Sequence, residues 1–466
     1  MPTPRHGRGS GGRLIPPGLH DPAGALAVSG ASVRGYPASN KPPTHAPQES
    51  VLAPTRAAVH RPLLYAQSWL TDFANALFVF TLTRHLAEQD GDLVHLGVLG
   101  TCGSLSYAVS AAVCGHVSDR LGRRRLIALG GVAFATAYGL ALWSLAVPLI
   151  YLEAAVGGLA TALVFPPLIA LLSSGDGAAR AASHTRTLIL FCLSWNLGVV
   201  SGNLSGGLLY AVDPQVSLWI GIGLSALHLG LSGVAALGLR APPRDPLPVG
   251  AEATRPADDP LRPLASEHGR EETGEPRARQ LFFAAVGWLA NVSGSIAMSL
   301  ILYLLPRLVT GLGISAPVHG AMVMMARLAV VSTYLLLHFT RFWRFRLAPG
   351  VVAQAIAMVG LAVLSTAVSV AALTAGVMLV GVMMGYSYFS SIYYSTTGFA
   401  EGRRGLASGV HEGTLAVGFT LGSLGGGYLG AALGVRAPFQ VGIAVLAASA
   451  ALQVLGYAWF RRRPAA

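Results

Sequence analysis

Runs of about 20 mostly apolar residues recur a dozen times along the 466 residues of this chain, and they restrict its fold more than any other feature. A helix of that length crosses the ~30 Å hydrocarbon core of a bilayer. The composition agrees, since 53% of the residues are hydrophobic, 11% are charged and the mean hydropathy is +0.57. The sequence therefore predicts an all-α polytopic protein whose main partner is the lipid bilayer. The predicted spans are 62–83, 93–114, 126–147, 149–173, 187–210, 217–239, 281–305, 318–338, 350–370, 372–396, 407–432 and 438–460.

Arginines indicate the orientation of the spans, because loops rich in Lys and Arg stay on the cytoplasmic side of a membrane. They are concentrated in alternate connections, for example at Arg123–Arg125 and at Arg341, Arg344 and Arg346. We therefore expect a multi-pass protein of the cytoplasmic (inner) membrane with both termini in the cytoplasm. The net charge of +12 comes from residues at span ends and not from one basic domain, which argues against nucleic acid as a partner.

Two polar segments divide the chain. Residues 1–58 are rich in Arg, Pro and Gly, and we expect a disordered cytoplasmic tail. Residues 241–279 mix acids with arginines, and a segment so short and polar is predicted to be a cytoplasmic linker. The predicted organisation is a six-helix bundle at 59–240, a second bundle at 280–461 and a short tail at 462–466.

The two predicted bundles share an internal repeat. Trp69-Leu70-x-Asp72 in the first span recurs 219 residues later as Trp288-Leu289-x-Asn291 in the seventh. Four glycines of the fifth span recur 220 residues later in the eleventh, and small residues one turn apart let helices pack closely in lipid. The sequence thus predicts a duplicated six-helix unit with close packing between its halves. The packing glycines are Gly198, Gly202, Gly206 and Gly207, and Gly418, Gly422, Gly426 and Gly427.

One charged loop follows the second predicted span and reads GHVSDRLGRRRLI. It fills the pattern Gly-x-x-x-Asp-Arg-x-Gly-Arg-Arg with Gly115, Asp119, Arg120, Gly122, Arg123 and Arg124. With this loop and its paired halves, the chain resembles the major facilitator superfamily of secondary transporters. The resemblance implies two pseudo-symmetric six-helix bundles, a central site, alternating access, and a gating role for the loop in which Asp119 acts as a latch. The glycines of this loop are expected to allow a sharp turn between helices.

Three departures limit what the resemblance implies. Asn203 stands where superfamily antiporters have a proline, and Glu153 stands before Gly157 where many members have an arginine. An antiport mechanism that uses that arginine is therefore not carried over, and Glu153 is expected simply to reach water at a helix end. The corresponding loop of the second half, Arg341–Arg346, lacks the aspartate, so we expect asymmetric gating.

Polar residues inside the predicted spans are the candidates for a substrate or proton site, because such groups are costly in a bilayer. Asp72 lies about ten residues into its span, near the membrane midplane, and could take up a proton there; Asn75 shares its face. An arginine at a similar depth, Arg327, needs an acidic partner or an anionic substrate, and Glu412 is the best candidate partner. The residues leave open whether that pair is static or exchanges with a substrate. The full candidate set is Asp72, Asn75, Asn291, Ser295, Arg327, His411 and Glu412, with several tyrosines of the tenth span nearby.

These features predict a monomeric secondary active transporter that moves a small molecule by alternating access, with proton coupling through Asp72 or Glu412. No cofactor or metal site is expected. An enzyme is not expected either, since no nucleophile and base pair, metal cluster or phosphate loop occurs at a usable spacing. A small metabolite, an organic anion or an exported drug would fit the polar set. Two alternatives are an uncoupled facilitator and a ligand sensor that does not transport.

Overall fold

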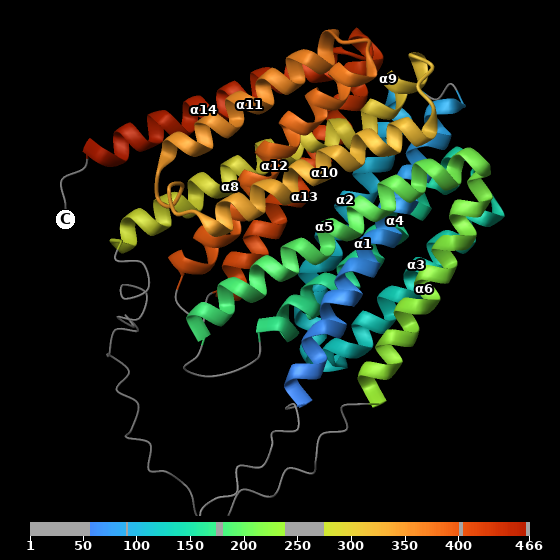
Figure 1. Ribbon diagram of the computed structural model, residues 1–466, viewed down its shortest axis with the longest axis horizontal. Coiled ribbons are helices and arrows are strands. Elements are labelled where there is room, and N and C mark those ends of the chain that lie inside the picture. Colours follow the sequence, from blue (N-terminus) through green and yellow to red (C-terminus); the bar gives the residue numbers. More distant parts are fainter. Residues whose placement is uncertain (1–55, 90–91, 174–179, 238–274, 400–403, 463–466) are drawn as a thin grey trace, which may run out of the picture. The chain divides into compact units, whose positions relative to one another are not determined.

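The computed structural model describes residues 56–89, 92–173, 180–237, 275–399 and 404–462, and within these ranges its regular structure is helical (Figure 1). Each predicted span corresponds to one helical segment. The first half of the chain forms α1 (Arg56–Glu88), α2 (Leu93–Leu121), α3 (Arg123–Trp143), α4 (Val147–Ser173), α5 (Arg180–Val212) and α6 (Pro214–Leu237). The second half forms α8 (Arg277–Ser299), the π-helical turn η1 (Leu300–Leu304), α9 (Leu305–Gly311), α10 (Ala316–Phe339), α11 (Leu347–Thr366), α12 (Val370–Gly398), α13 (Arg404–Leu433) and α14 (Ala437–Arg462).

Eleven of these segments are long and apolar enough to cross a membrane, and α8, η1 and α9 together form one of them. α1 has the length but falls short in hydropathy because Gln67, Asp72 and Asn75 interrupt its apolar sequence. Gln67 and Asp72 are buried in the protein. With α1 the structure has the twelve predicted spans. The low hydropathy of α1 reflects polar side chains that point into the protein.

Several predicted boundaries are wrong by a few residues. α1 begins at Arg56, so residues 56–58 are helical and do not belong to a tail. α8 begins at Arg277, so the last three residues of the predicted linker are also helical. The seventh span continues through η1 to Gly311 instead of ending near 305. The rest of the predicted N-terminal tail, residues 241–274 of the linker and residues 463–466 lie outside the described residues.

Glycines hold α5 against α1, and their counterparts hold α13 against α8 (Figure 1). A methyl group on Gly202 would lie 2.6 Å from the Phe73 carbonyl oxygen, and one on Gly422 would lie 2.7 Å from that of Ile296. Gly198 and Gly418 likewise lie close to the carbonyls of Trp69 and Val292. Gly206 lies against the Phe80 side chain of α1, and Gly426 lies against Leu300 and Leu304 of η1. These glycines therefore pack helices closely within each half, and the arrangement repeats from one half to the other.

Only the last glycine of each set lies between the halves. Gly207 of α5 lies against Ala316 and Gly320 of α10, and Gly427 of α13 lies against Gly97 of α2. The expectation that the glycine pattern as a whole joins the halves is therefore wrong, since the other six glycines pack helices of the same half. The reason is geometric: residues 198, 202 and 206 follow one helix face, whereas Gly207 is rotated about 100° from Gly206.

Hydrogen bonds between the halves form a row along α2 and α13. Thr101 is 3.3 Å from Ser423, Ser104 is 2.8 Å from Thr420, and the Tyr107 hydroxyl donates to Glu412 at 3.0 Å. Before this row, at the end of α1, Arg84 donates to the Ile314 carbonyl at 3.0 Å, and Arg307 donates to that of Ala87. No hydrogen bond joins described residues of the two halves further along α2 than Tyr107. The hydrogen bonds between described residues of the two halves thus run from the Arg84 end to the middle of α2.

Candidate substrate site

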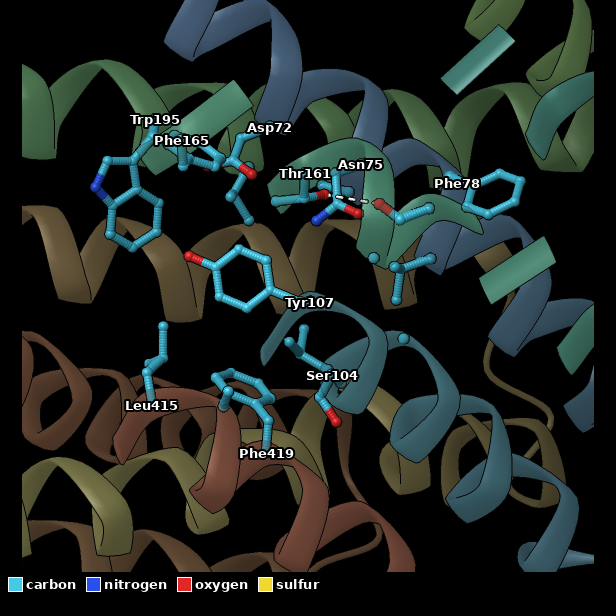
Figure 2. Close-up of a pocket in the computed structure, with 18 of the residues that line it drawn as sticks. Asp72, Asn75, Phe78, Ser104, Tyr107, Thr161, Phe165, Trp195, Leu415 and Phe419 are labelled. Atoms are coloured by element: carbon cyan, nitrogen blue, oxygen red, sulfur yellow. Dashed lines mark hydrogen bonds between the residues drawn. The ribbon is translucent and has the colours of Figure 1, made fainter. Parts of the chain in front are cut away.

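A cavity of about 210 Å³ lies between the two halves, next to the inner end of the α2–α13 row. Figure 2 shows the Tyr107 ring in its middle, with Asp72, Phe165 and Trp195 on one side and Leu415 and Phe419 on the other. Both halves contribute polar groups to its wall. The first half supplies Asp72, Asn75, Ser104, Tyr107, Thr161, Trp195 and Asn203, and the second supplies Tyr303, Arg327, Tyr388 and Glu412.

Asp72 projects from α1 into this cavity with 6% of its surface exposed. Its position follows from the close α1–α5 packing, because Gly198 leaves room for the Asp72 Cβ beside α5. Its carboxylate accepts no hydrogen bond from the residues that the structure describes. A buried carboxylate without donors is costly, so Asp72 is available to a ligand or a proton.

Arg327 enters the same cavity from α10 and is 5% exposed. Its Nε has no hydrogen-bond partner, and Arg327 forms no ion pair with any described residue. Asp72 on the facing half is close enough to interact with it electrostatically. The site therefore presents an unpaired cation and an unpaired anion on opposite halves.

Glu412 of α13 is bound by two tyrosines. Tyr107 of α2 donates to Oε2 at 3.0 Å, and Tyr388 of α12 donates to Oε1 at 3.1 Å. The predicted pairing of Glu412 with Arg327 is therefore wrong for this structure. Hydroxyl donors from two helices bond to the two carboxylate oxygens, and Arg327 forms neither a hydrogen bond nor an ion pair with Glu412.

Of the seven predicted site residues, Asp72, Asn75, Arg327 and Glu412 line the cavity. Asn291, Ser295 and His411 do not. Asn291 donates to the His411 carbonyl at 3.2 Å and to the Thr414 hydroxyl at 3.0 Å, between α8 and α13, and Ser295 lies against Gly418 there. These three residues thus hold α13 in place behind the cavity.

His411 lies behind the carboxylate of its neighbour. Its Nδ1 is 2.9 Å from the Ser391 hydroxyl, and its ring meets the Tyr388 ring edge-on at 4.7 Å. Its Nε2 is 3.9 Å from Glu412 Oε1, which is too far for a hydrogen bond. His411 therefore acts on the site through the placement of Tyr388.

Sequence reasoning missed most of the aromatic wall, including Tyr107, Phe165, Trp195 and Tyr303. Aromatic residues are common throughout apolar helices, so composition alone does not separate those that face a cavity from those that pack. The spacing of Thr101, Ser104 and Tyr107 along one face of α2 is a signal that could have drawn attention to Tyr107.

Comparison with known proteins decides the family. The model of the Major Facilitator Superfamily matches residues 64–412, which is most of the chain. The chain belongs to the major facilitator superfamily. Among curated proteins none matches it.

Solved transporter structures share the superfamily fold with this chain. A bacterial homologue of the human lysosomal transporter Spinster, in an inward-facing and unoccupied conformation, matches with a TM-score of 0.66 and 13% identity over 89% of this chain and 100% of that one. The nucleoside transporter NupG, in a mutant form, matches with a TM-score of 0.61 and 13% identity over 85% of this chain and 99% of that one. The human organic anion transporter MFSD10 matches with a TM-score of 0.57 and 17% identity over 84% of this chain and 99% of that one. Together with the family match, these neighbours identify a multi-pass membrane transporter of the superfamily fold.

The superfamily loop pattern lies at the junction of α2 and α3. Asp119 and Arg120 belong to the last turn of α2, and Gly122 makes the predicted sharp turn with a φ of 89°, where a residue with a Cβ would be strained. Arg123 donates to the Ala170 carbonyl at 3.2 Å and so connects α3 to the end of α4. The surroundings of Gly115 and the side chains of Asp119 and Arg120 lie outside what the structure describes, so the latch stays a prediction.

The matching loop of the second half is held by aromatic packing. Trp343 is buried and donates to the Leu337 carbonyl at 2.8 Å. The Tyr394 hydroxyl donates to the Trp343 carbonyl at 3.1 Å and accepts from the Phe345 amide at the same distance. The two superfamily loops thus turn by different means.

Glu153 of α4 does not reach water, contrary to expectation. It is fully buried, neither carboxylate oxygen has a hydrogen-bond partner, and it does not line the cavity. Among the described residues, no three His, Cys, Asp or Glu side chains converge as metal ligands.

Proposed function

We propose that this superfamily member is a secondary active transporter that moves a small molecule by alternating access of its two halves and couples transport to protons through Glu412. One observation carries the proposal: a cavity walled by charged groups from both halves lies where the hydrogen-bonded row between those halves ends. A ligand in this position contacts both halves at once, as alternating access requires.

Glu412 is favoured as the proton carrier because its hydrogen bonds depend on its charge. The ionised carboxylate accepts from both tyrosines, and hydrogen bonds to a charged acceptor are roughly twice as strong as neutral ones. A proton on either oxygen removes the charge and replaces an acceptor with a donor. Among the described residues, the bond from Tyr107 is the last of the row between the halves, so proton uptake weakens their connection at the cavity.

Orientation follows from the arginines. If the connection at Gly122–Arg125 is cytoplasmic, the joined end near Arg84 faces outward and the cavity is reached from the cytoplasm. Proton release to the cytoplasm would then restore the full set of bonds on Glu412.

Transport by purified protein in lipid vesicles with an imposed pH gradient tests this proposal. We expect gradient-driven accumulation of at least one compound from a labelled panel of amino acids, organic anions and organic cations. Glu412→Gln should abolish accumulation but keep exchange of the same compound across the membrane, because the glutamine amide neither binds nor releases a proton. Glu275→Gln is the matched control, since Glu275 bonds to Arg279 at the start of α8.

Other results would identify the alternatives. Accumulation that survives both Glu412→Gln and Asp72→Asn would indicate a proton path elsewhere in the chain. Equilibration of a compound without gradient-driven accumulation by the unmodified protein would indicate an uncoupled facilitator. Ligand binding without flux in either direction would indicate a sensor and contradict transport.

A further inference from the structure

Asp72 and Arg327 face one cavity from opposite halves, and the structure gives neither a partner among its described residues. Removing the partner of a buried charge typically costs several kcal/mol, because the remaining charge is neither solvated nor paired. Glu412 forms no ion pair with Arg327, and its two oxygens accept from tyrosines instead. The cavity therefore contains one positive and one negative group that interact across it but form no hydrogen bond or ion pair with any described residue.

A ligand with a single charge satisfies only one of these groups. An organic anion on Arg327 would leave the Asp72 carboxylate without a donor, and an organic cation on Asp72 would leave the guanidinium without an acceptor. A proton on Asp72 removes that charge but does nothing for Arg327. A ligand that carries both signs satisfies both residues at once.

The rest of the wall indicates the body of the ligand. Phe165, Phe191 and Trp195 line the cavity from the first half, and Phe419 lines it from the second. Aromatic surface of this kind favours an apolar or aromatic group and adds attraction to an ammonium. The volume of about 210 Å³ is below the roughly 300–1,000 Å³ typical of sites for drug-sized ligands, which favours a small metabolite.

We propose, on the basis of the transport function proposed above, that the substrate is a small zwitterion with an aromatic or large apolar body, its ammonium on Asp72 and its carboxylate on Arg327. The guanidinium suits this task because its planar set of donors matches the two oxygens of a carboxylate. Aromatic α-amino acids are the simplest members of this class.

Such a substrate connects α1 of the first half to α10 of the second. It would therefore bind most tightly to a conformation that brings Asp72 and Arg327 toward it together. A ligand shifts a conformational equilibrium by its difference in affinity between the two states, so a zwitterion would favour closure of the halves around the cavity.

Three compounds that share one ring test the proposal: phenylalanine, phenethylamine, which lacks the carboxylate, and 3-phenylpropionate, which lacks the amine. We expect phenylalanine, or tyrosine or tryptophan in its place, to raise the melting temperature of the full-length purified protein at concentrations where the singly charged analogues do not. Asp72→Asn and Arg327→Gln should each weaken binding of the zwitterion about 30-fold or more.

The same variants give a second result that loss of folding does not mimic. Asp72→Asn keeps the arginine and should now bind 3-phenylpropionate better than phenethylamine, whereas Arg327→Gln should show the reverse order. Asp213→Asn and Arg436→Gln are matched controls outside the cavity and should bind like the unmodified protein. Asp213 caps the start of α6, and Arg436 donates to carbonyls within the second half.

Equal or tighter binding of either singly charged analogue by the unmodified protein would overturn the zwitterion, as would the absence of binding by every aromatic amino acid. Both results are distinct from failure of the proposed transport function. Gradient-driven uptake of a singly charged compound would support the proposed transport function but contradict the zwitterionic substrate.

Discussion

Tyr107 and Tyr388 donate to the same carboxylate but come from different halves. Tyr388 and Glu412 both belong to the second half, so their hydrogen bond persists when the halves separate. Tyr107 belongs to the first half, so its bond to Glu412 breaks on separation. The two tyrosines therefore have different roles although their chemistry is the same. Replacing each one by phenylalanine distinguishes these roles.

Tyr107→Phe should shift the conformational equilibrium toward separated halves, and Tyr388→Phe should not. Loss of a hydrogen bond to a charged group costs about 1.5–3 kcal/mol, which corresponds to roughly 10-fold or more in the ratio of the two states. Distances between spin labels at Val109→Cys of α2 and Val417→Cys of α13 would report the shift. Both sites are exposed, and the three native cysteines would first be replaced by alanine. Equal shifts in the two tyrosine variants would contradict this division of roles.

The four cavity residues Asp72, Asn75, Arg327 and Glu412 were predictable because charged and amide groups are rare within spans and usually face inward. Their partners were not. Whether Arg327 meets Glu412 depends on the rotation of α10 and α13 about their axes, and hydropathy carries no information about the rotation of one helix relative to another. Tyr107 could be recognised as a partner of Glu412 only once α2 lay beside α13, and Tyr388 only once the rotation of α12 was known.

At the scale of elements, two glycines of α5 contact different helices. Gly202 places α5 against α1 within the first half, whereas Gly207 places α5 against α10 of the second half. A side chain at the first position should disturb folding of the half, and one at the second should disturb contact between folded halves. Gly223 of α6 has open space around it and provides a control.

Gly202→Ala should lower the stability of the protein by about 1–3 kcal/mol, because the new methyl group would lie 2.6 Å from the Phe73 carbonyl oxygen and adjacent backbone would have to move. Gly223→Ala should have little effect. Thermal unfolding of both variants in detergent, followed by circular dichroism, would measure the difference. Equal melting temperatures would show that α1 and α5 are less closely packed than described.

Gly207→Ala should leave each half folded but hinder their joining, because its methyl group would lie 2.5 Å from the Ala316 carbonyl oxygen. We expect the distance between labels on α5 and α10 to increase at the Arg84 end and the transport rate to fall. A fall in transport without a change in that distance would point to a different cause.

The fold of the whole molecule was largely predictable, since the twelve predicted spans correspond to the observed helices and the repeat appears in the mirrored glycine contacts. The π-helical turn at Leu300–Leu304 was not predictable, because its apolar residues suit an α-helix equally well. The conformation was not predictable either. The same sequence must fold into both access states. The sequence alone therefore does not indicate whether the structure is closed at the Arg84 end or at the opposite end.

Arg84 joins the two halves at that end with its guanidinium. Its Nε donates to Glu88 at 2.7 Å and its Nη2 donates to the Ile314 carbonyl of the second half at 3.0 Å, while Tyr210 donates to the other Glu88 oxygen. Lysine lacks the planar fork that makes two such bonds together. Arg84→Lys should therefore weaken closure at this end.

A cysteine at Ala316, which is buried in the present structure, should react roughly tenfold faster with a water-soluble maleimide in the Arg84→Lys background. Arg436→Lys is the matched control, because the bonds of Arg436 to the Leu364 and Ala367 carbonyls stay within the second half. Unchanged reactivity in the Arg84 variant would show that the glycine contacts alone keep this end closed.

The contacts of Gly207 with Gly320 and of Gly427 with Gly97 also set how strongly the closed end is held. Each buried leucine or phenylalanine adds about 1.5–3 kcal/mol to an interface in water, whereas glycine has no side chain to bury. A closed end built on large apolar residues would hold the molecule in one state. Two contacts between glycines exclude water by close approach yet expose little apolar surface when they part, so these contacts themselves add little to the free energy of opening. A proton or a bound substrate then has less apolar burial to overcome at these two points.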